Sequence, residues 1–300
     1  KNKKMKHTLK ITLLLVFIFF ITQIIGLSIT NKYIDHKTIA ETGKVTFEAL
    51  PYNLERPQIE ESTSYIWIFS AIIIGTLLML ILIKFRKMGL WKLWFFLAVF
   101  STMAIAFSAF IPQTIAAILA LILALIKVYK PTTTLQNLTE IFIYGGLAAI
   151  FVPIMNIFAV FTLLILISIY DIIAVRHTKH MVTLAKFQAK SNVFAGLLIP
   201  YSKGKIAHKG IIEKKGMGKI AVLGGGDIGF PLIFAGVVMK GLMLNNPELI
   251  GFLKTLIIPV FVSLALLYLL VRSEKNKFYP AMPYLTSGCV IGYLVVLLLF

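Results

Sequence analysis

The chain has 300 residues, of which 59% are hydrophobic, a mean hydropathy of +0.90 and a net charge of +18. Soluble domains contain roughly 45–50% apolar residues, so this composition excludes a soluble globular protein. The basic residues gather at the ends of apolar segments and no nucleic-acid-binding motif accompanies them, which excludes nucleic acid as a partner.

Apolar runs long enough to cross a bilayer, about 17–25 residues, recur along nearly the whole chain. We therefore predict an all-α polytopic membrane protein with nine transmembrane helices. The predicted spans are Leu9–Thr30, Tyr65–Ile83, Trp91–Ile111, Gln113–Val128, Leu135–Val152, Ile154–Val175, Ile220–Met239, Leu249–Val271 and Pro280–Phe300. The single cysteine, Cys289, lies in the last span and excludes an intrachain disulfide.

Two of these boundaries follow from helix length. As one helix, Trp91–Val128 would be about 57 Å long, against a bilayer core of about 30 Å, so we expect a turn at Pro112. Leu135–Val175 would be about 61 Å long, and we expect it to turn near Pro153.

The spans divide one integral membrane domain into three parts. Residues 1–175 form a six-span N-terminal half, residues 176–219 a basic cytoplasmic loop, and residues 220–300 a three-span C-terminal half. With the N-terminus inside, 24 of the 30 lysines and arginines are cytoplasmic, which predicts a cytoplasmic N-terminus and an external C-terminus. The basic cytoplasmic segments should contact anionic lipid.

Two polar segments have ambiguous structure. The external segment Asn31–Ser64 has residues suited to short strands or to an interfacial helix, and the sequence does not choose between them. Within the basic loop, the apolar stretch Val193–Tyr201 either lies on the membrane surface or packs back onto the helices. Glu140 and Lys254 are interpreted as ordinary residues at the ends of spans.

Asp171 and Asp227 lie inside apolar spans, where an ionisable group costs about 3 kcal/mol or more and is a functional-site hypothesis by default. With helical rise, Asp171 is about 7.5 Å from the cytoplasmic boundary at Arg176. On the same assumption, Asp227 is about 12 Å from the boundary at Lys219. The two carboxyl groups are therefore expected at similar depth on antiparallel helices.

Two carboxyl groups at close range cannot both ionise and therefore hold a single proton. The ionised group can accept a proton from an attacking water, and the protonated group can hydrogen-bond a peptide carbonyl, as in an aspartic protease. Which aspartate plays which role remains open. The alternative is a transporter or channel that uses both acids as a proton or cation site, and a non-catalytic scaffold would leave them unexplained.

The residues around Asp227 and at the start of the last span favour an irregular backbone. Gly224–Gly226 remove side chains before Asp227, and Gly229 and Pro231 weaken the helix after it. The segment Pro280–Pro283 opens the ninth span at the same face. An unwound substrate segment could pair with such backbone as an added strand. The duller alternatives are helix packing by the glycines and a helix start at the prolines.

Three short motifs resemble the presenilin and signal-peptide-peptidase family of intramembrane aspartyl proteases. That family has Tyr-Asp in the sixth span, Gly-x-Gly-Asp in the seventh and Pro-Ala-Leu at the ninth. The corresponding residues here are Tyr170-Asp171, Gly224-Gly225-Gly226-Asp227 and Pro280-Ala281-Met282. The departure is Met282 in place of leucine, which keeps an apolar side chain of similar volume.

The resemblance implies a presenilin-like fold that contains an aspartic endopeptidase. It implies that Asp171 and Asp227 are catalytic and that no cofactor or metal is needed. The residues that it assigns to substrate binding or positioning are Tyr170, Gly224, Gly226, Pro280, Ala281 and Met282.

The same resemblance bears on substrates and partners. The substrates would be single-span transmembrane proteins or peptides with an external N-terminus. The size resembles a microbial homologue that works without partner subunits, and a homo-oligomer stays open. It also suggests that residues 176–219 are cut by the protein itself.

Two other site types are excluded. His177, His180 and His208 have no cysteine or nearby carboxylate to complete a metal site. Gly224–Gly226 precede an aspartate rather than the Lys-Ser/Thr of a phosphate-binding loop, which excludes nucleotide binding.

Overall fold

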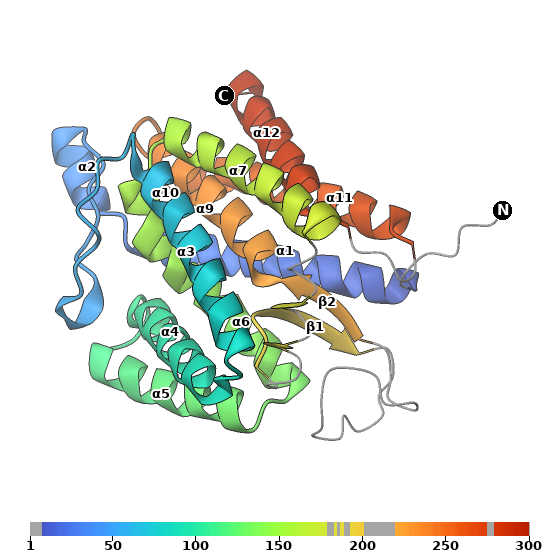
Figure 1. The fold of residues 1–300 in the computed structure, drawn as a ribbon. Coiled ribbons are helices and arrows are strands. Elements are labelled where there is room, and N and C mark those ends of the chain that lie inside the picture. Colours follow the sequence, from blue (N-terminus) through green and yellow to red (C-terminus); the bar gives the residue numbers. More distant parts are fainter. Residues whose placement is uncertain are drawn as a thin grey trace.

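The computed structural model describes residues 8–178, 183–184, 187–188, 193–200, 220–274 and 279–299. Within these residues the chain is mostly helical, with one two-stranded sheet (Figure 1). The N-terminal elements are α1 (Leu9–Lys32), α2 (His36–Thr42), η1 (Pro51–Asn53), α3 (Ser64–Lys84), α4 (Met88–Ser108), α5 (Gln113–Tyr129), α6 (Thr133–Phe151), η2 (Val152–Ile154) and α7 (Ile157–Ile172). They are followed by the π-helical turn η3 (Ile173–His177), β1 (Gly196–Pro200), β2 (Ile220–Gly224), α9 (Gly225–Leu242), α10 (Glu248–Thr255), α11 (Ile257–Arg272) and α12 (Met282–Leu299).

Eight helical segments of the described residues are long and apolar enough to cross a membrane. They are Leu9–Lys32, Ser64–Lys84, Met88–Ser108, Thr133–Ile154, Ile157–His177, Gly225–Leu242, Glu248–Arg272 and Met282–Leu299. The remaining predicted span corresponds to α5, an apolar helix of 17 residues. Exposed apolar side chains cover much of α3 and α5, as expected of helices whose outer faces contact lipid.

The two predicted turns are confirmed. Helix α4 ends at Ser108 and α5 begins directly after Pro112. Pro153 lies in the short η2 turn that separates α6 from α7. The predicted span Leu249–Val271 is divided at Leu256 into α10 and α11, an interruption that its uniform hydropathy does not indicate.

The predicted helix Ile220–Met239 is wrong in its first turn. Residues Ile220–Gly224 form strand β2, which pairs antiparallel with β1, and helix α9 begins only at Gly225. An apolar run of five residues is ambiguous between strand and helix, and the glycines that follow it disfavour helix.

The polar segments also take definite structures. Residues 193–200 of the predicted apolar stretch do not stay on a membrane surface but pack back, because β1 lies against α6. The segment Asn31–Ser64 contains the short helix α2, the turn η1 and one isolated antiparallel bridge between Ile34 and Phe47, and no strand.

The core is centred on α1, α6 and α9, with the pair α11–α12 on one side and the pair α4–α5 on another (Figure 1). Small residues allow the closest helix pairs. A Cβ atom on Gly288 or Gly292 of α12 would come within 2.9 Å of the α11 backbone, so these positions require glycine. Helices α7, α9 and α12 contact one another, and the strands lie at one end of α9.

Candidate active site

Asp171 lies in the last turn of α7, where it is 6% exposed. Its Oδ2 accepts a hydrogen bond of 3.0 Å from the backbone N–H of Met282, the first residue of α12. A carboxylate at the N-terminus of a helix is favourably placed against the helix dipole. One turn before Asp171, the hydroxyl groups of Ser168 and Thr286 lie 2.8 Å apart and join the same two helices.

The Pro280-Ala281-Met282 segment is therefore in direct contact with Asp171 through its backbone. Met282 is 3% exposed and Pro280 is buried, so the segment is part of the packed interior. The structure brings the predicted sixth-span and ninth-span motifs together.

Asp227 is the third residue of α9, at the junction of a strand and a helix. Gly224 is the N-cap in an extended conformation, and the N–H of Gly225 donates to the carbonyl oxygen of Ala195 at 3.2 Å. A Cβ atom on Gly224 would lie 3.3 Å from Asp227 Oδ2, so the carboxyl group folds back over the end of β2. Asp227 itself is half-buried.

Asp171 on α7 and Asp227 on α9 lie on helices that contact each other and that both contact α12, which begins with Met282. The expected depth of about 12 Å for Asp227 assumed a helix from Lys219 and does not apply, because Ile220–Gly224 is a strand.

Tyr170 is directed at α3. Its hydroxyl donates to Thr76 Oγ1 at 3.1 Å, and its ring packs edge to face on Phe69 with 6.5 Å between centroids. Gly226 is exposed, and the nearest atoms to an added Cβ belong to the Phe230 ring at 3.3 Å. Gly226 therefore adds no side chain beside Asp227. Tyr170, in contrast, connects α7 to the neighbouring helix α3.

Helix α9 contains Pro231, and the turn that this proline weakens has a hydrogen-bond partner on α1. Pro231 lacks the N–H that would bond to the carbonyl group four residues earlier. Gln23, 1% exposed, donates from Nε2 to the carbonyl oxygen of Ile228 at 2.9 Å and supplies a donor in this weakened turn. Gln23 could have been recognised from the sequence, because it is a polar residue within a long apolar run.

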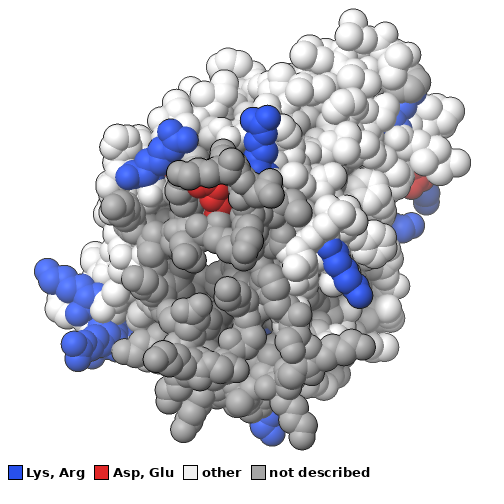
Figure 2. Space-filling model, turned by 90° about the vertical axis from the view of Figure 1, so that its right-hand side faces the viewer, with Lys and Arg blue, Asp and Glu red and all other residues white. Residues whose placement is uncertain are grey.

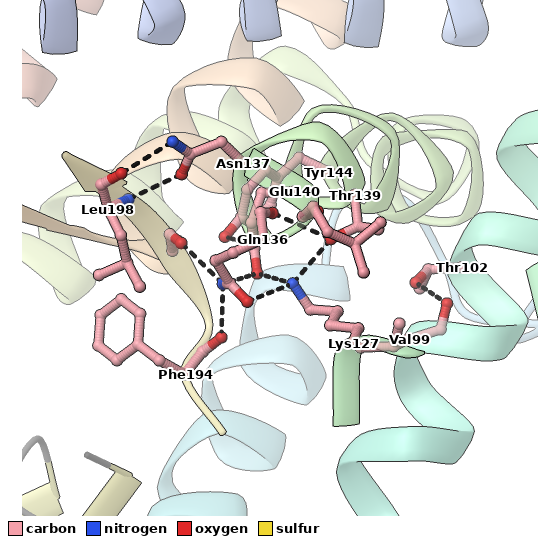
Figure 3. A network of polar contacts seen from close by, with 12 residues as sticks. Val99, Thr102, Lys127, Gln136, Asn137, Thr139, Glu140, Tyr144, Phe194 and Leu198 are labelled. Carbon is pink, nitrogen blue, oxygen red and sulfur yellow. Dashed lines mark hydrogen bonds and ion pairs between the residues drawn. The ribbon is translucent and has the colours of Figure 1, made fainter. Parts of the chain in front are cut away.

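Glu140 is not an ordinary span-end residue, and that interpretation is wrong. Glu140 Oε1 lies 2.7 Å from Lys127 Nζ, and each side chain is 1% exposed (Figure 3). Lys127 also donates to Gln136 Oε1 and Thr139 Oγ1, each at 2.9 Å, and Tyr144 donates to Glu140 Oε2. The available signal was the four-residue spacing of Gln136, Glu140 and Tyr144, which places them on one face of a helix.

The network continues from α6 to β1. Gln136 Nε2 donates to the carbonyl oxygens of Phe194 and Gly196 at 2.8 and 3.0 Å. The side chain of Asn137 both donates to and accepts from the backbone of Leu198, each at 2.8 Å (Figure 3). Helix α6 thereby holds the strand that pairs with β2.

In the part of the chain that the structure describes, no cluster of three or more His, Cys, Asp or Glu residues could hold a metal ion. His177 is exposed at the end of η3. His180 and His208 lie outside the described residues.

Comparisons with known proteins identify the class of protein. The family model described as "Signal-peptide peptidase, presenilin aspartyl protease" matches residues 46–300. One similar solved structure, a presenilin family intramembrane aspartate protease in space group C222, has a TM-score of 0.62 and 20% identity, covering 96% of this chain and 99% of that one. Another, in space group P2, has a TM-score of 0.59 and 21% identity, covering 97% and 98%. No curated protein matches the chain.

The chain belongs to the signal-peptide peptidase and presenilin family of aspartyl proteases. It is an integral, multi-pass membrane protein and an aspartic endopeptidase of the intramembrane type. The resemblance drawn from its three motifs is confirmed at the level of the family.

Proposed function

We propose that this protein hydrolyses peptide bonds within transmembrane helices of other membrane proteins, with Asp171 and Asp227 as the catalytic pair. The observation that carries the proposal is the meeting of three motifs at one site. Met282 donates its N–H to Asp171 on α7, and α9, which carries Asp227 in its first turn, contacts both α7 and α12. In a family of aspartyl proteases, two carboxyl groups in one membrane-embedded site are the expected machinery.

The mechanism needs one proton shared by two carboxyl groups. The ionised aspartate accepts a proton from a water molecule as the water oxygen attacks the carbonyl carbon of the scissile bond. The protonated aspartate donates a hydrogen bond to the carbonyl oxygen, where negative charge develops. The proton then passes to the leaving nitrogen as the C–N bond breaks, so no cofactor enters the balance.

The substrate class follows from backbone chemistry. A helix in a bilayer protects its peptide bonds, so cleavage needs local unwinding and new partners for the freed groups. Among the described residues, β2 pairs with β1 along one edge only, and Val222 on it is 46% exposed. We propose that an extended substrate segment pairs with the other edge of β2, which leads directly to Asp227. Pro280, Ala281, Met282, Tyr170, Gly224 and Gly226 would shape this binding region.

The finer topology is also part of the proposal. At 17 residues, α5 is about 25 Å long, at the lower limit for a span, so we count it as the ninth. Figure 2 views the end of the molecule that carries the strands, and the charged side chains visible on its described surface are mostly Lys and Arg. This supports a cytoplasmic N-terminus, an external C-terminus, substrates with an external N-terminus and contact with anionic lipid.

Two earlier expectations stay predictions. The predicted self-cleavage falls in residues 176–219, most of which lie outside the described residues. It would appear as two fragments in purified wild-type protein and not in the Asp227→Asn variant. A homo-oligomer is likewise a prediction, and the mass of the detergent-solubilised protein would decide it.

The test is cleavage of a single-span substrate by the full chain in proteoliposomes. Asp171→Asn and Asp227→Asn should each abolish cleavage, and a peptide mimic with a hydroxyl group in place of the scissile carbonyl should block it. Asp35→Asn is the matched control, because Asp35 is the one other aspartate of the sequence and lies in the segment predicted to be external. If the wild type moves ions in a manner that depends on both aspartates but cuts no substrate, the transporter alternative replaces the proposal.

A further inference from the structure

Tyr144 lies against the first turns of α9 from the neighbouring helix α6. The side chain is 4% exposed. A Cβ atom on Gly225 would lie 2.6 Å from the Tyr144 hydroxyl oxygen, and one on Gly229 would lie 3.6 Å from the ring. The tyrosine thus fills the space that the absent side chain at Gly225 leaves open, and its hydroxyl touches the backbone that carries Asp227.

The Tyr144 hydroxyl group is fixed by a hydrogen bond within α6. It donates its hydrogen bond to Glu140 Oε2, while Glu140 Oε1 is bound by Lys127 at 2.7 Å and by Gln136 at 2.8 Å (Figure 3). A fixed hydrogen bond to a charge-balanced carboxylate gives the Tyr144 oxygen one position beside Gly225.

Helix α6 also supports the backbone at Gly224–Gly226, the glycine junction between β2 and α9, indirectly through the two-stranded sheet. Gln136 and Asn137 bind the backbone of β1, β1 pairs with β2 up to Gly224, and the carbonyl oxygen of Ala195 accepts from the N–H of Gly225. The junction is therefore held by β1 and by Tyr144, both of which depend on α6.

A junction of three consecutive glycines needs such support. Glycine loses more conformational freedom on folding than any other residue, so Gly224–Gly226 alone do not specify where Asp227 lies. Catalytic groups require placement to within about 0.5 Å, and a misplacement of about 1 Å can cost on the order of 100-fold in rate.

We propose that Tyr144, oriented by Glu140 and Lys127, is a positioning residue that fixes the glycine junction and so places Asp227 for catalysis. The inference rests on the proposed role of Asp227. It assigns to α6, which carries none of the three motifs, a direct part in forming the active site.

The first measurement is the split between kcat and KM for Tyr144→Phe. This variant keeps the ring and removes only the hydroxyl. We expect kcat to fall about 10-fold or more with KM changed less than about two-fold, and affinity for the hydroxyl-bearing mimic to fall by about the same factor as kcat/KM. Tyr129→Phe is the control, because Tyr129 is 70% exposed at the end of α5 and should keep wild-type kinetics.

The second measurement is a double-mutant cycle with Gly225→Ala. The added methyl group meets the Tyr144 hydroxyl at 2.6 Å, so the single variant should lose most of its activity. Once the hydroxyl is removed, the nearest ring atoms lie 3.3 Å away, so Gly225→Ala should cost several-fold less in the Tyr144→Phe background. Gly226→Ala is the matched control, since its methyl group meets Phe230 and its loss should be the same in both backgrounds.

Two results would overturn the inference: wild-type kcat in Tyr144→Phe, or additive losses in the Gly225 cycle. If Tyr144→Phe lowers the melting temperature markedly, the cycle decides, because relief of the Gly225→Ala loss is measured within that same background. Failure of the proposed function looks different. In that case the wild type cuts no substrate, or the Asp227→Asn variant still cuts it.

Discussion

Two pairs of ionisable side chains within the helical bundle are built in opposite ways. Lys127 and Glu140 carry opposite charges 2.7 Å apart, are each 1% exposed and have additional hydrogen-bond partners. Asp171 and Asp227 would carry charges of the same sign if both were ionised, and Asp227 is half-buried. An opposite-charge pair compensates part of the cost of its own burial, whereas a like-charge pair adds repulsion to that cost.

The opposite-charge pair has a structural role, whereas the two aspartates are expected to have a functional one. Lys127 and Glu140 fix the side chains of α6 and, through Gln136, the strand β1. Asp171 accepts a backbone hydrogen bond from Met282, but within the described part of the chain no Lys or Arg forms an ion pair with either aspartate. The first two predictions below test whether the two pairs respond differently to the loss of one ionisable group.

The largest expected effect is on activity at the like-charge pair. Asp171→Asn or Asp227→Asn should lower cleavage roughly 1,000-fold or more, because each removes a group that transfers a proton or stabilises developing charge. The melting temperature in detergent should stay equal or rise, since the substitution replaces an ionisable group within the bundle by a neutral one of the same shape. Unfolding of both variants at clearly lower temperature than wild type would contradict the distinction between the pairs.

The opposite-charge pair should show the reverse behaviour. Glu140→Gln leaves a buried ammonium group without its counter-charge, a loss of about 3–5 kcal/mol in the free energy of unfolding. Lys127→Met combined with Glu140→Gln removes both charges and should recover most of this stability. Denaturant titration of the three proteins measures the effect. A double variant no more stable than Glu140→Gln would show that the stability does not come from charge compensation.

The contrast between the pairs also explains what could be predicted from the sequence. The basic residues nearest to Asp171 and Asp227 in the sequence, Arg176 and Lys219, lie at the ends of the predicted spans, so each aspartate stands out within an apolar run. Glu140 and Lys127 are 13 positions apart on different helices, near span ends, and hydropathy does not reveal that they pair.

The backbone conformation shows the same contrast between features that the sequence indicates and features that depend on contacts with distant segments. Pro112 and Pro153 mark turns that helix length already required. Ile220–Gly224 was expected as helix because five apolar residues carry no decisive period, and its strand conformation depends on β1, which α6 holds. The part of the site that sequence could not supply is therefore the part that depends on contacts between distant segments.

A smaller effect is expected in the pH dependence of cleavage. If one carboxyl group must be protonated and the other ionised, cleavage should give a bell-shaped profile of kcat against pH. Glu140 and Lys127 should not contribute to this profile, because neither takes part in the proposed proton transfer. The measurement is cleavage rate across pH in proteoliposomes of fixed composition, and a rate that stays constant across both limbs would contradict the shared proton.

The smallest effect is expected at Asp35, the aspartate outside the pair. Asp35 is the N-cap of α2, and hydrogen bonds from the Thr38 side chain and backbone hold the pKa of its carboxyl group below the usual value. A lowered pKa in the folded state means that the stabilisation is present above the unfolded-state pKa and is lost as pH falls through the folded-state value. Asp35→Ala should therefore speed hydrogen exchange in residues 36–42 at neutral pH and leave cleavage unchanged. Loss of cleavage in this variant would mean that a helix-capping carboxylate outside the pair matters as much as Asp171 and Asp227, and the assignment of function to these two residues would fail.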